Sequence, residues 1–173
     1  MQYVIRSAVT AGTKPLPVTK SGLYLLLTSA DVDVQNFCNQ ICGFHSLTWK
    51  TIMRYTLLYA WVGNSAKLCP QTCAFPFSVP EYIPGFKALK PPNSDVGVDG
   101  MISFIGHELA ELATDPLGNA WYSGQEGKDG ATYNMNGIKR RYLVQWVWNH
   151  VVSNCTGPNA LDQWNHVMGF CYN

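Results

Sequence analysis

The strongest pattern of hydrophobic and polar positions lies in residues 99–114. Polar side chains recur there at every fourth position, as Ser103, His107 and Glu111. At 3.6 residues per turn they share one face of a helix. The opposite stripe is apolar and consists of Met101, Ile105, Leu109 and Leu112. The spacing predicts an amphipathic helix over about 99–114, with Asp99 as its N-cap.

Elsewhere the pattern predicts short strands. Apolar runs at residues 22–28 and 54–62, each bounded by turn residues, are typical of buried strands. Residues 141–149 alternate like a half-buried strand, whereas residues 133–137 have the composition of a turn. Together these elements predict an α+β fold, in which a small twisted sheet is backed by the helix at 99–114.

Six cysteines punctuate the chain: Cys38, Cys42, Cys69, Cys73, Cys155 and Cys171. The first four form two C-x-x-x-C pairs, and an even count favours disulfides over a zinc knuckle. We expect residues 38–45 and the proline-rich residues 69–92 to be long loops stapled by these bridges. Six cysteines permit 15 pairings, so the partners stay open. A glycosylation sequon at Asn154 agrees with secretion.

The composition limits the classes of function. Of 173 residues, 47% are hydrophobic and 13% charged, which suits one core and a single domain over 1–173. A formal net charge of +1, with no basic block, gives no electrostatic footprint for nucleic acid. No apolar run reaches the roughly 18 residues of a membrane span. The aromatic residues favour a dense core over a stacking groove.

The first ten residues lack the apolar segment of a signal peptide. Instead, the apolar residues there look like one face of a helix and are Val4, Ile5, Ala8 and Val9. Because this pattern is typical of a helix whose beginning has been cut away, we expect a chain truncated at its N-terminus, either a mature protein or an incomplete gene model.

The residues His107, Glu108 and Glu111 form the sequence His-Glu-x-x-Glu, which resembles the His-Glu-x-x-His helix of zinc peptidases. Zinc accepts carboxylate oxygen at nearly the distance of imidazole nitrogen. His107 and Glu111 are therefore candidate Zn²⁺ ligands, and Glu108 is the candidate general base. This predicts a zincin-like domain; the alternative is a helix with one solvated polar face.

A third ligand is needed, and two residues are candidates. Glu126 lies in a glycine-rich loop that can fold back over the helix, and it is our preferred ligand. Asp115 lies on the helix face itself, but Pro116 disfavours helical backbone at that position.

Several motifs together resemble the plant Exordium, or phosphate-induced, protein family. They are LTSADV (27–32), CGFH (42–45), WVGNS (61–65), CPQTCAFPF (69–77) and DVGVDGM (95–101). The resemblance implies a secreted, apoplastic or cell-wall protein linked to growth, with a signal peptide and an N-terminal portion that this chain lacks. The His-Glu-x-x-Glu helix is typical of a subtype in which Glu126 and Asp129 match acidic residues of the next loop.

Three functions are compatible with these residues. The first is a secreted Exordium-like protein with a zinc peptidase-like site acting on extracellular peptides. The second is a non-catalytic protein that binds wall components or a receptor and retains the helix only as structure. The third and weakest is a carbohydrate-binding module that stacks sugars on exposed aromatic rings.

Overall fold

The computed structural model describes the chain except residues 20, 81–84, 115, 118–131, 138–139, 146, 150–153 and 157–173. The helices are α1 (Gln2–Thr10), α2 (Pro70–Cys73) and α3 (Val96–Thr114). The main sheet contains β1 (Leu23–Thr28), β2 (Gly43–Leu47) and β3 (Leu58–Gly63). Two further strand pairs are β4 (Thr132–Gly137) with β5 (Arg140–Gln145), and β6 (Val147–Asn149) with β7 (Asn154–Thr156). The predicted α+β class is confirmed.

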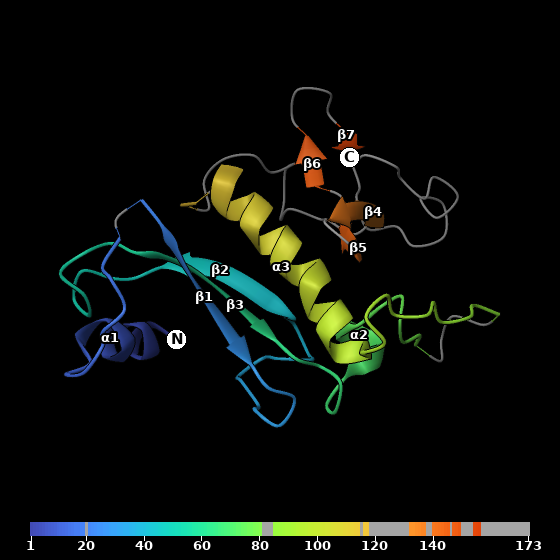
Figure 1. Cartoon of the computed structure of the whole chain (residues 1–173), viewed down its shortest axis with the longest axis horizontal. Coiled ribbons are helices and arrows are strands. Elements are labelled where there is room, and N and C mark those ends of the chain that lie inside the picture. Colours follow the sequence, from blue (N-terminus) through green and yellow to red (C-terminus); the bar gives the residue numbers. More distant parts are fainter. Residues whose placement is uncertain are drawn as a thin grey trace.

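The central strand of the main sheet is β3, which pairs in parallel with β1 and antiparallel with β2. Paired residues lie on the same face, so the register assigns faces to side chains. His45 pairs with Ala60, while Phe44 pairs with Trp61 on the other face. Figure 1 shows α3 lying across this sheet. Strand β3 is almost wholly buried because it is central in the sheet and packs against α3. The edge strand β1 forms as predicted, but the prediction that it is buried is wrong, since Leu23, Leu25 and Leu27 are 40–53% exposed.

Helix α1 packs on the Tyr59 side of the sheet. Its residues Ile5 and Val9 are buried with Tyr59 and with Met53 of the β2–β3 loop. Val4, by contrast, is 57% exposed. The helix predicted at the start of the chain is therefore confirmed, with a narrower buried face than the sequence indicates.

Helix α3 begins three residues before the predicted start. The Asp95 carboxylate accepts a hydrogen bond of 3.0 Å from the Val98 amide, so Asp95 is the cap. The prediction that Asp99 caps the helix is wrong. Asp99 is buried in the first turn, where it accepts hydrogen bonds from the backbone and side chain of Asn93. The early start adds a turn to the helix.

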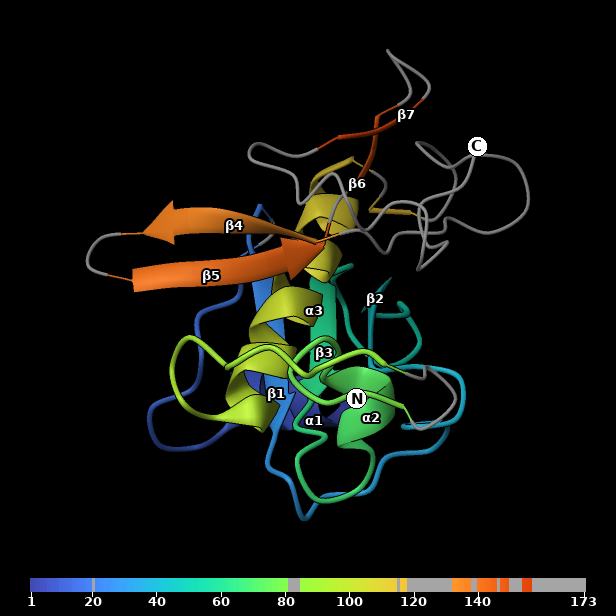
Figure 2. The same cartoon turned by 90° about the vertical axis from the view of Figure 1, so that its right-hand side faces the viewer.

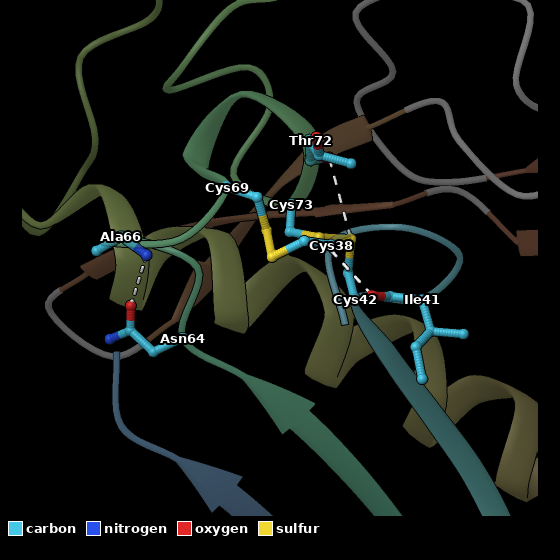
Figure 3. The surroundings of a disulfide bond; sticks show 8 residues. All are labelled: Cys38, Ile41, Cys42, Asn64, Ala66, Cys69, Thr72 and Cys73. Carbon is cyan, nitrogen blue, oxygen red and sulfur yellow. Dashed lines mark hydrogen bonds between the residues drawn. A yellow bond between two sulfur atoms is a disulfide. The ribbon is translucent and has the colours of Figure 1, made fainter. Parts of the chain in front are cut away.

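Two disulfides join the segment before β2 to the segment around α2. They are Cys38–Cys69 and Cys42–Cys73, each spanning 31 residues of sequence (Figure 3). Bridging is thus confirmed for four cysteines; the Cys155 side chain and Cys171 lie outside the described residues. The predicted stapled loops contain regular structure after all, namely β2 and the single turn α2.

The second half of the chain also departs from the pattern. Residues 133–137, predicted as a turn, belong to strand β4, because backbone pairing with β5 supplies the hydrogen bonds that a turn would have supplied. The strand predicted at 141–149 is divided between β5 and β6. Figure 2 shows β4 and β5 lying across α3, and β5 packs against that helix. In the described part of the chain, no helix is long and apolar enough to cross a membrane.

The close contact between α2 and α3 gives a first prediction. A Cβ on Gly100 would lie 2.9 Å from the Cα of Ala74 and 3.0 Å from the carbonyl oxygen of Cys73. We expect Gly100→Ala to lower the free energy of unfolding by about 1–3 kcal/mol through overpacking, although alanine normally favours a helix. Urea unfolding measures the change. Gly12→Ala is the control, since nothing lies within 4 Å of its Cβ position; equal effects would contradict the packing argument.

Candidate metal centre

The candidate site lies where strand β2 meets helix α3. Pairing with Ala60 directs His45 to the α3 face of the sheet, and Glu108 and Glu111 are one turn apart on the helix. Gly43 permits the close approach, because a Cβ there would lie 3.1 Å from Glu108 Oε1. The fold therefore brings together residues that are 63 positions apart in sequence.

Short contacts connect the side chains of the site. His45 Nδ1 lies 3.2 Å from Glu108 Oε2 and 2.9 Å from Glu111 Oε2. His107 Nε2 lies 3.3 Å from the same Glu111 oxygen. One donor atom from each of His45, Glu108 and Glu111 lies within 4.8 Å of the other two. These three side chains could hold a metal ion, and His107 borders them through Glu111.

The pKa values of the two carboxyl groups, Glu108 and Glu111, are shifted in opposite directions, and both groups contact His45. Hydrogen bonds to Glu108 and then to Glu111 raise the pKa of His45 to about 10, against the opposing effect of burial. Burial acts to raise the pKa of Glu111, but hydrogen bonds from His107 and His45 lower it to about 2. Glu108 is only 3% exposed, and this burial raises its pKa in spite of His45. Without a metal, the imidazolium of His45 neutralises the charge of Glu111.

The donor set fits a small divalent cation. Donors that bind zinc at about 2.0–2.1 Å in a tetrahedron are separated by about 3.3 Å. The contacts of 2.9 and 3.2 Å from His45 are close to that separation, and all three donor atoms lie within 4.8 Å of one another. One imidazole and two carboxylates are ligands that zinc commonly takes. A cation at this site would replace the proton on His45 Nδ1, the atom that contacts both carboxylates.

The structure brings together some of the predicted site residues. Glu108 and Glu111 are in the cluster, and His107 is beside it. Asp115 and Glu126 lie outside the described residues. Sequence reasoning missed His45, which it placed in a loop; the signal was the CGFH motif, whose histidine lies two residues after a glycine that opens the strand.

Ser103 occupies the predicted polar face one turn before His107. Its side chain is 2% exposed, and within the part of the chain that the structure describes its hydroxyl has no hydrogen-bond partner. Glu108 is also buried, whereas His107 and Glu111 are half-buried, so the polar face of α3 is not fully solvated.

The fold and site define a small, disulfide-bonded α+β protein with a histidine–carboxylate cluster. Residues 1–129 match the family described as phosphate-induced protein 1 conserved region, and the chain belongs to this family. It is 58% identical to Protein EXORDIUM-like 3 of Arabidopsis thaliana, over 94% of this chain and 57% of that protein.

Two further relatives are more distant. Identity is 43% with Protein EXORDIUM-like 5 of Arabidopsis thaliana, over 94% of this chain and 53% of the relative. Identity is 34% with Protein PHOSPHATE-INDUCED 1 of Nicotiana tabacum, over 79% of this chain and 54% of that protein. The chain thus spans about half the length of the curated relatives it matches. No solved structure matches it.

A double-mutant cycle tests the contact between His45 and Glu108. His45→Gln leaves the buried Glu108 carboxylate with a weaker donor, and we expect it to cost about 1–3 kcal/mol of unfolding free energy in EDTA at pH 7. Glu108→Gln removes the charge that needs compensation, so the double variant should lose less than the sum. Urea unfolding of all four proteins gives the coupling energy, and strict additivity would contradict the contact.

Proposed function

We propose that this chain is the conserved part of an extracellular, growth-associated plant protein whose function depends on a zinc ion held between β2 and α3. The observation that carries the proposal is the cluster of His45, Glu108 and Glu111. Two disulfides support an oxidising, extracellular compartment. The family resemblance supports the link to growth and to the cell wall.

Zinc at this position would cross-link the sheet to its covering helix. Two carboxylates balance the charge of a divalent cation, and His45 supplies a neutral nitrogen once its proton is displaced. Glu108 is 3% exposed and already bound to His45, which suits a metal ligand better than a base that must meet a substrate. The geometry therefore favours a non-catalytic, metal-stabilised protein that binds wall components or extracellular peptides.

A zinc peptide hydrolase is the second candidate function. It is supported by the order His107, Glu108, Glu111 on a helix that packs against a sheet, a zincin-like arrangement. In that case His107, Glu111 and Glu126 hold the ion, with Asp115 as the alternative third ligand. A bound zinc ion supplies Lewis-acid polarisation and a more acidic water. Glu108 would then accept a proton at its carboxylate.

Metal content separates the two ligand sets. Wild-type protein should retain about one zinc ion per chain after dialysis. Glu111→Ala should lose the ion under either ligand set, because two donors hold zinc far less well than three. His45→Ala should lose zinc if β2 supplies a ligand, whereas His107→Ala should lose it in the hydrolase arrangement. Asp95→Asn is the control, since asparagine also caps helices. A wild-type protein without zinc, or equal zinc in every variant, would refute the proposal.

The variant Glu108→Gln distinguishes a ligand from a base. If Glu108 is a ligand, the amide should weaken zinc binding, and no peptide hydrolysis should be detected in either protein. If Glu108 is a general base, the variant should keep its zinc while hydrolysis of a casein substrate falls by about 10²- to 10⁴-fold. Metal analysis and casein turnover on the same sample decide between these outcomes.

A further inference from the structure

Three aromatic side chains are exposed at the end of the sheet opposite the disulfides. Tyr3 is 67% exposed, Trp49 is 61% exposed and Tyr55 is 40% exposed. Tyr3 belongs to α1, while the other two lie in the β2–β3 loop. Leaving the Trp49 indole in solvent loses much of the free energy that its burial would contribute, so its exposure points to a contact with a partner.

Helix α1 and the β2–β3 loop form one continuous surface. The Trp49 amide donates a hydrogen bond of 2.9 Å to the side-chain oxygen of Gln2. Met53 of the loop packs in the same core cluster as Ile5 of the helix. Figure 1 shows the loop beside α1. Substitutions of the exposed side chains leave these contacts in place, so the surface can be altered without unfolding it.

The same surface carries cations and no described anion. Arg6 follows Gln2 by four residues, so it lies on the same flank of α1 as Gln2, which accepts the hydrogen bond from the β2–β3 loop. Lys50 and Arg54 are exposed in the loop. Among the described residues none of these three cations forms an ion pair, and no acidic residue occurs in sequence positions 1–30 or 34–80.

The described acidic residues lie elsewhere. Asp31 and Asp33 come after the C-terminal end of β1. Asp95 lies at the start of α3, which contacts Asn64, the residue that follows β3. Glu108 and Glu111 lie on the opposite face of the sheet. Among the residues that the structure describes, no carboxylate therefore neutralises the positive charge at the loop, although the chain as a whole is near neutrality.

We infer that the patch of Tyr3, Arg6, Trp49, Lys50, Arg54 and Tyr55 binds an acidic polysaccharide. Aromatic rings stack on the apolar faces of pyranose rings, and the cations match uronate carboxylates at the edges of those rings. Single-stranded nucleic acid has the same two features, flat rings and negative charge. The choice of polysaccharide rests on the extracellular location in the proposed function.

Affinity electrophoresis of the full chain in EDTA tests the inference, with polygalacturonate as the probe. EDTA excludes bridging of carboxylates by metal. Trp49→Ala should weaken binding about five- to tenfold, which corresponds to the loss of one aromatic stacking contact, whereas Trp49→Tyr should retain most of it. The pair Lys50→Gln and Arg54→Gln should also weaken binding and reduce its dependence on salt.

The control is the pair Lys87→Gln and Lys90→Gln, which removes the same charge from an exposed segment on another part of the chain. This control pair should leave binding of polygalacturonate unchanged. If it weakens binding as much as the Lys50→Gln and Arg54→Gln pair does, the effect is one of net charge and the inference is overturned. Fully methyl-esterified polygalacturonate should bind poorly, and equal binding would refute a role for charge. Tighter binding of poly(U) at the same salt would make the patch a nucleic-acid surface. Glu111→Ala should bind polygalacturonate normally, so this result is independent of the zinc site.

Discussion

The attachment of β2 to the helical side of the molecule is the constraint on which the candidate site depends. Cys42 is covalently bound to Cys73 of α2, and the backbone of α2 lies so close to Gly100 that α3 has no room for a side chain there. One residue beyond the disulfide, Gly43 begins the strand and lies against Glu108. A covalent bond and two glycine contacts thus fix the distance between His45 and the carboxylates of α3 before any charge interaction is considered.

This arrangement explains why the sequence predicted two of the three residues of the site, Glu108 and Glu111, but not His45. His107, Glu108 and Glu111 share a local pattern, and a helical repeat identifies such residues without knowledge of the fold. His45 is 63 residues from Glu108, in a strand whose five residues are all half-buried and show no alternation. Only the antiparallel register with β3 directs His45 to the helix, and register is a property of the assembled sheet. The disulfide partners were beyond reach for a similar reason, because many pairings of six cysteines are compatible with the sequence.

The same distinction between local and assembled signals holds for the fold. The buried run that became β3 and the periodic helix α3 were predictable, because each buries a face that its own residues define. The prediction failed for β4, where asparagine and glycine favour a turn but pairing with β5 provides the backbone hydrogen bonds. It also failed for the cap of α3, since Asp95 and Asp99 are both suitable residues and only the buried contact with Asn93 assigns Asp99 another role. Tertiary contacts decided each case.

Charge shows how much a composition can conceal. A net charge of +1 indicates no affinity for a charged partner. The charges are nevertheless separated: the cations Arg6, Lys50 and Arg54 lie around the β2–β3 loop, whereas Glu108 and Glu111 lie on the α3 face of the sheet. The two sets are carried by different faces of one sheet, so a cation bound at α3 need not alter the field at the loop in physiological salt. The central strand β3 separates them, and it is uncharged along its whole length. One small core thus carries exposed cations at the β2–β3 loop on one side and a largely buried histidine–carboxylate cluster on the other.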